Sequence, residues 1–235
     1  MLDPASQTRD LDTPALTRRH SPLAGTAEQP DLLLIERARG GSEQAIEALV
    51  RRYVRRLYRV ARSVIVDDEY AELAVQEACI AAFGDLTGYE PTGKFAAWLT
   101  RLAYQHARSA RLPGGRSLRP AAAAAAAAAS GQLQERRELT HAIEQLPQVF
   151  RTVFVLRVVE GISGVETAAS LGVHETTVRT RLYRALRRLD ADRVRSIRLQ
   201  PDLMDLPAAA AQRLVTATLA HLPHGPVPAG GAAAP

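Results

Sequence analysis

The sequence predicts an all-α protein of two small helical domains joined by a flexible linker, and three observations support this fold class. Apolar residues recur at three- and four-residue spacing in two blocks, residues 31–112 and 132–198, and do not alternate with the period of a β-strand. A Pro-, Gly- and Ala-rich stretch at residues 113–131, with nine consecutive alanines, separates the blocks and is interpreted as the linker. A length of 235 residues also favours two modest domains over one large core.

The first block predicts three helices. Apolar side chains repeat along residues 46–64, and most of the arginines in this stretch fall on the other side. Two aspartates at 67–68 mark a break and an N-cap, and a second helix over residues 71–82 has a face of small residues suited to close packing. Glycines and a proline at residues 84–93 predict a loop, after which a third helix starts near Lys94.

The second block predicts a helix-turn-helix as its most specific motif. An apolar stripe stops at Pro147 before it. Ser163 and Glu166 form a capping box, and Gly172 takes the turn, while valines fill the angle between the two helices. The N-terminal half of the last helix, residues 174–189, would enter the major groove, where Arg pairs with guanine and Thr contacts the thymine methyl group. The alternative is a basic, solvent-exposed helix of an ordinary bundle.

The terminal segments predict little regular structure. Residues 1–30 contain few aromatics and scattered prolines, so we expect a disordered arm, and they lack the apolar stretch of a secretory signal. The Ala- and Pro-rich tail at residues 199–235 is predicted to contain one weak amphipathic helix over residues 206–222. Because no apolar run approaches the ~20 residues of a membrane span, membrane insertion is not expected.

Composition indicates nucleic-acid binding and argues against catalysis. The net charge is +5 and Lys94 is the only lysine, so arginine supplies nearly all of the cations; its guanidinium group suits phosphates and guanine edges, although Arg usage also follows genomic base composition. The single Cys79 excludes an intramolecular disulfide and fits a reducing, cytoplasmic compartment. The six histidines show no metal-ligand spacing, and no phosphate-binding glycine loop or nucleophile motif occurs. We therefore predict no enzyme, no metal and no cofactor.

Several segments, in order along the chain, resemble parts of bacterial sigma factors. EALVRRYVRRLYRVARSVI at residues 47–65 is similar to the opening helix of region 2, AELAVQEACIAAF at residues 71–83 to the polymerase-binding helix, and YEPTGKFAAWLTRLAYQHAR at residues 89–108 to the helix that opens the −10 element. LPQVFRTVFVLRVVEGIS at residues 146–163 is similar to the lead-in to region 4, and the helix-turn-helix to region 4 itself. Over residues 31–190 the order, the spacing and the missing middle domain resemble the extracytoplasmic-function group of the sigma-70 family.

This resemblance implies a sigma factor that binds core RNA polymerase through its two largest subunits, recognises the −35 and −10 promoter elements and promotes DNA melting, with an anti-sigma factor as a further partner. Residues 31–112 would be region 2 and residues 132–198 region 4. The implied −35 contacts are His174, Glu175, Thr176, Thr177, Arg179, Thr180, Arg181, Tyr183 and Arg184. The implied −10 contacts are Tyr89, Lys94, Arg101, Gln105 and Arg108, and the implied polymerase contacts are Leu73, Gln76 and Glu77.

The chain departs from the usual family pattern at four positions. Leu73 and Gly41 stand where the family usually has Asp, Gln105 where it has Asn, and Thr176 where it often has Gly. These changes leave the strength of polymerase binding and the −10 preference open. Two alternatives also remain: a sigma-mimicking protein that sequesters an anti-sigma factor, and a helix-turn-helix regulator that binds DNA without polymerase. The Arg-rich last helix argues against the first, and Leu73 argues weakly for it.

Overall fold

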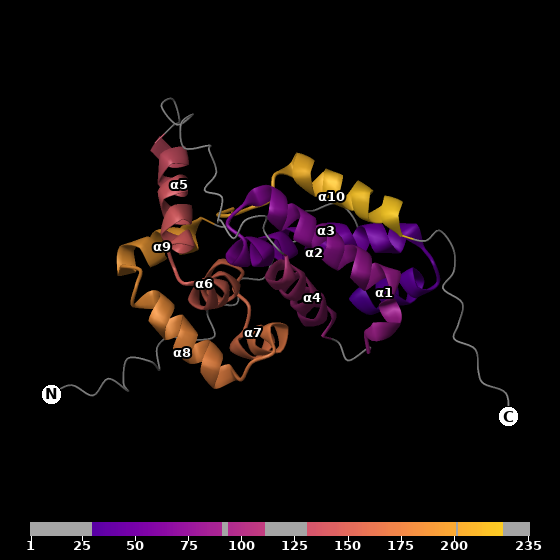
Figure 1. Ribbon diagram of the computed structural model, residues 1–235, viewed down its shortest axis with the longest axis horizontal. Helices are drawn as coiled ribbons and strands as arrows, with labels where there is room; N and C mark the ends of the chain where they lie inside the picture. Colours follow the sequence, from indigo (N-terminus) through magenta and orange to yellow (C-terminus); the bar gives the residue numbers. More distant parts are fainter. Residues whose placement is uncertain (1–29, 91–93, 111–130, 201, 223–235) are drawn as a thin grey trace.

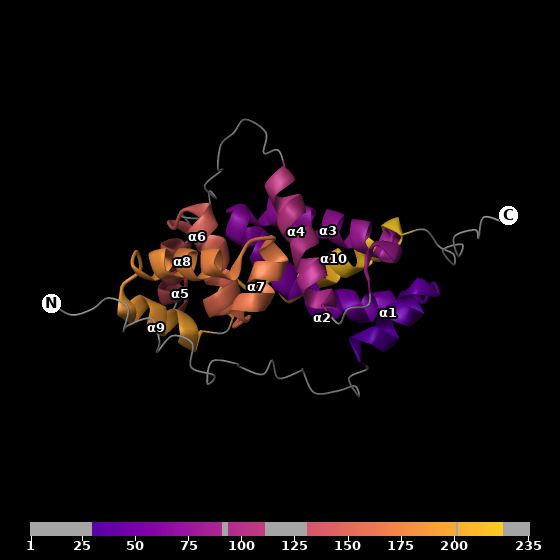
Figure 2. The ribbon, with the colours of Figure 1, turned by 90° about the horizontal axis from the view of Figure 1, so that it is seen from below.

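The structure is a computed structural model that describes residues 30–90, 94–110, 131–200 and 202–222. In these ranges the regular secondary structure is entirely helical, which confirms the predicted fold class. The helices form two lobes that lie side by side in two perpendicular views (Figures 1 and 2). The predicted arm lies outside the described residues except for Pro30, and so does the alanine run of the predicted linker.

The first lobe is built on one long amphipathic helix. Ser42 caps α2 by accepting a hydrogen bond from the backbone N–H of Ala45, and Asp67 caps α3 by accepting one from Tyr70, as predicted for the aspartate pair. In the turn before α2, Gly41 has a φ of 84°, a conformation that a side chain at this position would strain. The elements of this lobe are α1 (Asp31–Arg39), α2 (Glu43–Val64), α3 (Asp68–Gly84), the 3₁₀ turn η3 (Leu86–Gly88) and α4 (Phe95–Ser109).

Small residues bring α3 close to its neighbours, as the sequence predicts. Ala71, Ala74, Ala78 and Ala82 are all buried in the core that α3 shares with α2 and α4. Cys79 lies in the same core, and burial raises the pKa of its thiol to about 12. The thiol is therefore protonated at neutral pH and shielded from reagents.

Cys79 provides a simple test of this packing. Because only the thiolate reacts and the side chain is buried, we expect a thiol-specific reagent at neutral pH to modify the native chain at least about a hundredfold more slowly than the chain unfolded in denaturant. Absorbance of the released thiolate measures both rates. Comparable rates would contradict the packing of α3.

The second lobe is a smaller bundle around one aromatic side chain. Phe154 is fully buried at its centre, among Leu139 and Ile143 of α5 and apolar residues of α8 and α9. Gly131, predicted as the last linker residue, is instead the first residue of α5. The elements of this lobe are α5 (Gly131–Glu144), α6 (Gln148–Phe154), the π-helical turn η6 (Val155–Val159), α7 (Gly164–Leu171), α8 (Glu175–Leu186) and α9 (Ala191–Leu199).

The C-terminal helix does not behave as a separate tail. The predicted weak helix is present as α10 (Ala208–His221), but it packs along α2 and α3 of the first lobe, where it is seen above them in Figure 1. Leu214 and Val215 join the core of that lobe. Residues 203–222 of the predicted tail therefore pack against the body of the protein, because apolar burial against a distant part of the chain decides their position.

Candidate nucleic-acid interface

The predicted helix-turn-helix is formed by α7, a tight turn and α8. The Ser163 hydroxyl caps α7 by accepting the backbone N–H of Glu166 at 3.1 Å. Gly172 adopts the left-handed conformation (φ 65°, ψ 38°) that ends α7, a position where any other residue would be strained. Val178 is buried in the angle between the helices, beside Leu171. Local spacing alone therefore predicted the motif correctly.

Helix α8 presents a polar face to solvent. Arg179 and Arg184 are exposed, and neither has an ion-pair partner within the described part of the chain. Thr180 is exposed, and its hydroxyl donates to the carbonyl oxygen of Thr176 at 2.9 Å. Seven of the nine implied −35 contacts are exposed, and Thr177 and Arg181 are half-buried; the exposed ones are His174, Glu175, Thr176, Arg179, Thr180, Tyr183 and Arg184.

The C-terminal part of α8 and its continuation carry two arginines that stack on aromatic rings. The guanidinium carbon of Arg187 lies 5.9 Å from the ring centre of Tyr183 and that of Arg188 lies 5.0 Å from the ring centre of Phe150. Arg187 also donates to the hydroxyl of Tyr183 at 3.2 Å. These contacts hold cationic groups beside the exposed helix face, where they add to its positive potential.

A second polar stripe follows α4 in the first lobe. Lys94, Arg101, Gln105 and Arg108 are all exposed, and their spacing places them along one side of the helix. The guanidinium carbon of Arg108 lies 5.6 Å from the ring centre of Tyr104. Four of the five implied −10 contacts are therefore exposed on α4 or at its N-cap, and one of them, Arg101, also donates to the backbone oxygen of Ala169 on α7.

Tyr89, the fifth implied −10 contact, is buried, and the prediction that it contacts DNA is corrected here. Its side chain is only 3% exposed, and its ring packs 5.1 Å from the ring centre of Phe95 and 5.3 Å from that of Trp98. Its position in this aromatic cluster makes it a core residue, so it does not offer a surface for an extruded base. The sequence placed it in a loop, where the packing of its ring could not be foreseen.

The implied polymerase contacts lie on the outer side of α3. Leu73 is 49% exposed, whereas Ala71, Ala74 and Ala78 of the same helix are buried. Gln76 is half-buried, and the carboxylate of Glu77 lies 3.6 Å from Nδ1 of His106 on α4. This surface is available to a partner and has one apolar residue at its centre.

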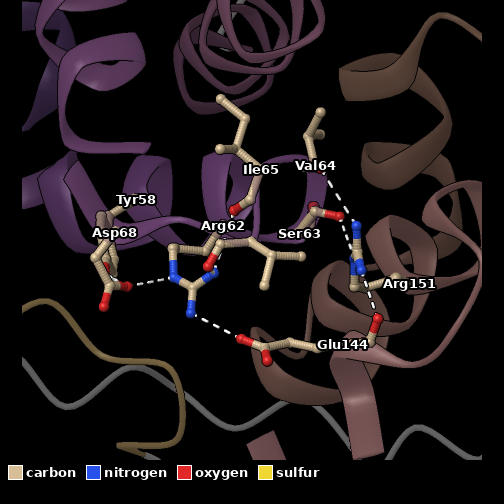
Figure 3. Close-up of polar contacts among 9 residues, drawn as sticks. Tyr58, Arg62, Ser63, Val64, Ile65, Asp68, Glu144 and Arg151 are labelled. Carbon is tan, nitrogen blue, oxygen red and sulfur yellow. Dashed lines mark hydrogen bonds and ion pairs between the residues drawn. The ribbon is translucent and has the colours of Figure 1, made fainter. Parts of the chain in front are cut away.

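The two lobes are joined by buried polar groups, as Figure 3 shows for Arg62. Nε of Arg62 lies 2.5 Å from Oδ1 of Asp68 in its own lobe, and its Nη2 lies 2.8 Å from Oε1 of Glu144 at the end of α5. A third nitrogen, Nη1, donates to the backbone oxygens of Ile65 and Val66. Burial lowers the pKa of Arg62, but Asp68 and Glu144 raise it by more, so the group stays cationic.

Arg151 of α6 reaches across in the opposite direction (Figure 3). Its Nε donates to the backbone oxygen of Ser63 at 2.6 Å and its Nη2 to that of Val64 at 3.3 Å, both at the C-terminal end of α2. Its Nη1 donates to the backbone oxygen of Glu144 at 2.6 Å. A cation at a helix C-terminus satisfies otherwise unpaired carbonyl groups, so Arg151 fastens α6 to α2.

Two further ion pairs and an apolar cluster complete the lobe contact. Nη1 of Arg59 lies 2.6 Å from Oε1 of Glu160, with both side chains buried, and Nη2 of Arg56 lies 2.6 Å from Oε1 of Glu166 on α7. The buried apolar cluster contains residues of both lobes. Its buried members are Val60, Tyr104, Val153, Leu156, Ile162, Ala168, Leu171 and Val178.

Sequence reasoning missed these connecting residues. It placed the arginines of α2 on a solvent-facing side, whereas Arg59 and Arg62 are buried. Their acidic partners lie 101 and 82 residues away in the sequence. Helical spacing shows which residues share a face, but it does not show that a second lobe will cover that face.

Within the described residues, no helix combines the length and the apolar character that a membrane span needs, and no group of three potential metal ligands occurs.

Comparisons with known proteins agree with both lobes. Residues 49–112 match the family model of sigma-70 region 2, and residues 136–189 match that of sigma-70 region 4, together half of the chain. The chain is 28% identical over 182 residues to the RNA polymerase sigma-H factor of Pseudomonas aeruginosa, covering 69% of this chain and 93% of that protein. It is 28% identical over 179 residues to the ECF RNA polymerase sigma-E factor of Escherichia coli K12, covering 68% and 92%.

A solved structure gives the same indication. The chain resembles CnrH, solved in complex with the cytosolic domain of CnrY, with 26% identity and a TM-score of 0.53, over 71% of this chain and 96% of that one. The match to region 2 thus covers α3, α4 and most of α2, and the match to region 4 covers most of the helix-turn-helix lobe. This chain belongs to the extracytoplasmic-function group of the sigma-70 family, and is a sigma factor for transcription initiation.

Proposed function

We propose that this sigma factor binds core RNA polymerase, recognises the −35 element through α8 and the −10 element through α4, and promotes melting of the promoter DNA. The observation that carries the proposal is the presence, in one chain, of two helices whose polar faces are exposed on folds matched by regions 4 and 2. A regulator that binds DNA alone would need only the helix-turn-helix. The second exposed face on α4 supports a protein that contacts the promoter at two places.

At the −35 element, the N-terminal half of α8 would enter the major groove. Arg179 is exposed and unpaired, so it can donate two hydrogen bonds to a guanine edge. Thr176 and Thr180, both exposed, would contact neighbouring bases, while Arg184 and Arg187 would contact phosphates. Phosphate contacts would set the register of the helix, and base contacts its preference.

At the −10 element, α4 would track the separated strand. Arg101 and Arg108 supply charge for the backbone, and Gln105 supplies an amide that both donates and accepts hydrogen bonds to base edges. Extruding a base costs a few kcal/mol, which stacking and polar contacts at the protein surface offset. Because Tyr89 is buried, this role falls to the exposed residues of α4 rather than to that ring.

The polymerase contact would lie on α3. The exposed surface around Leu73, Gln76 and Glu77 suits the clamp helices of the largest polymerase subunit, with Leu73 contributing an apolar contact in place of the usual acidic one. Region 4 would contact the second-largest subunit. By analogy with CnrH, which was solved with the cytosolic domain of CnrY, we also propose an anti-sigma partner, and we place the protein in the cytoplasm where it would meet polymerase.

Reconstituted transcription tests this proposal. The purified chain and core polymerase should form a complex and give discrete run-off transcripts from genomic templates. Leu73→Lys should weaken complex formation by about tenfold, because it places a charge at the centre of an apolar contact. Leu133→Lys, the same change at an exposed leucine of α5, serves as the control. Binding without transcripts from any template would instead indicate a sigma mimic, and DNA binding without co-purifying polymerase would indicate an independent regulator.

A further inference from the structure

The segment that follows the helix-turn-helix lobe returns to the first lobe and spans both. Leu203 and Met204 are buried in the core of the second lobe, whereas Leu206, two residues later, is buried in the core of the first. Met204 has a φ of 58°, so the backbone turns sharply at this crossing. The family match to region 4 ends at residue 189, so this crossing lies beyond the part of the chain that the family model describes.

We infer that residues 203–222, here called the strap, hold region 4 closed against region 2 and thereby restrain the chain from binding promoter DNA. The inference rests on the proposed function and adds a regulatory step to it. The strap consists of the crossing at residues 203–206 followed by helix α10.

A charge cluster fastens the strap at the crossing. The carboxylate of Asp205 lies 3.0 Å from Nη1 of Arg55 and 3.2 Å from Nη2 of Arg59, both on α2. The other terminal nitrogen of Arg59 pairs with Glu160 of the second lobe at 2.6 Å. One buried guanidinium group on region 2 thus contacts both region 4 and the strap. Because Arg59, Glu160 and Asp205 are largely withdrawn from water, each of these charges depends on its partners.

Helix α10 anchors the other end of the strap. Leu214 is buried against region 2. Nη1 of Arg51 donates to the side-chain oxygen of Gln212 at 2.9 Å, and Nη2 of Arg213 lies 3.1 Å from Oε2 of Glu72. Glu72 precedes Leu73 in α3, so α10 lies beside the surface proposed to bind polymerase. A partner that docks on α3 would therefore meet the strap at its edge.

The closed arrangement is incompatible with simultaneous contacts to both promoter elements. Positions −35 and −10 lie about 25 base pairs apart, or roughly 85 Å along the duplex axis at 3.4 Å per base pair. In this structure Nη2 and Nε of Arg101 on α4 donate to the backbone oxygen of Ala169 at 2.5 Å and 3.0 Å. The guanidinium group would lie 3.9 Å from a Cβ added to Gly172, in the turn before α8. Region 4 must separate from α4 before both helices can reach DNA.

Arg101 itself links the proposed −10 surface of α4 to region 4. The guanidinium group proposed to contact the −10 strand is engaged at the C-terminal end of α7, where unpaired carbonyl groups attract a cation. Tyr104, one turn further along α4, is buried among Leu156, Ile162 and Leu171 of region 4. The closed state therefore uses part of the surface of α4, and releasing the strap would favour its exposure.

Charge reversal at Asp205 tests the strap. Donor and acceptor dyes are placed at Leu32→Cys on α1 and Leu199→Cys on α9, both exposed, in a Cys79→Ala background. Asp205→Lys should shift the equilibrium toward separated lobes by about tenfold, which lowers energy transfer. With limiting core polymerase, the undyed variant should raise run-off transcription by a similar factor. Asp202→Lys changes the charge equally at an exposed site and should leave both readouts unchanged.

Arg55→Ala provides a second variant, because it removes a strap contact from the region 2 side at a half-exposed residue; it should change energy transfer in the same direction. Circular dichroism confirms that each variant remains helical. If neither variant lowers energy transfer below that of Asp202→Lys, the strap does not hold the lobes. If Asp205→Lys opens the lobes and the wild-type protein is active, but the variant transcribes no more than the wild type, the strap does not restrain transcription. If energy transfer falls in the variants but neither they nor the wild type give transcripts, the result would confirm that the strap holds the lobes together and would contradict the proposed function.

Discussion

Arg179→Ala and Arg184→Ala in α8 are expected to weaken promoter binding in two different ways. Arg179 lies in the half of the helix that would enter the major groove, so its removal should cost about 1–3 kcal/mol at the preferred −35 sequence and relax the preference at one base pair. Arg184 lies one turn after Thr180 and would contact phosphate. Its removal should weaken binding to all sequences alike and reduce the salt dependence of log K by about one.

Fluorescence anisotropy with the holoenzyme, over a salt series and a set of single base-pair changes, separates these two outcomes. Arg193→Ala is the matched control, because this exposed arginine lies on α9, after the helix-turn-helix, and pairs with Asp190 at 3.1 Å. It should change neither specificity nor salt slope. Equal losses for all three variants would indicate a general effect of positive charge and would contradict the placement of α8 in the major groove.

The sequence predicted those parts of the fold that depend on neighbours within a few turns. The capping role of Ser163, the turn at Gly172 and the burial of Val178 all follow from residues within about fifteen positions of one another. The exposed stripe on α4 followed in the same way, because a helix fixes which side chains share a face. Such features require no knowledge of the rest of the chain.

The connections between the lobes could not be predicted in this way. Arg59 and Arg62 carry the same charge as the exposed arginines elsewhere on α2, but both are buried beside acidic partners from distant segments. Glu144 of α5 pairs with Arg62, and Glu160 and Asp205 pair with Arg59. Tyr89 became part of an aromatic cluster because Phe95 and Trp98 fold back against it. For the two arginines a contact between distant segments, 101 and 82 residues apart, decides the position of the side chain, and a single sequence carries no signal for it. For Tyr89 the path of a loop decides it, which helical spacing does not describe.

The second large effect is expected from Phe154→Ala. The ring is 0% exposed at the centre of region 4, so truncation removes its buried apolar surface and leaves a cavity, at a cost of about 3–5 kcal/mol. Phe150→Ala, one turn earlier in α6, is the matched control. That ring is half-buried and lies 5.0 Å from the guanidinium carbon of Arg188, so its loss should cost only about 1–2 kcal/mol.

Two probes assign the effect to a lobe. Trp98 is the only tryptophan and packs beside Phe95 in region 2, so its fluorescence reports that lobe, whereas circular dichroism reports both. In Phe154→Ala, urea should first remove part of the helical signal and then change the fluorescence of Trp98 at higher concentration. The separation follows because a destabilised region 4 can unfold while the core of region 2 remains intact. Coincident transitions at an unchanged midpoint would show that Phe154 does not stabilise region 4, whereas equal losses for both variants would contradict the difference in their burial.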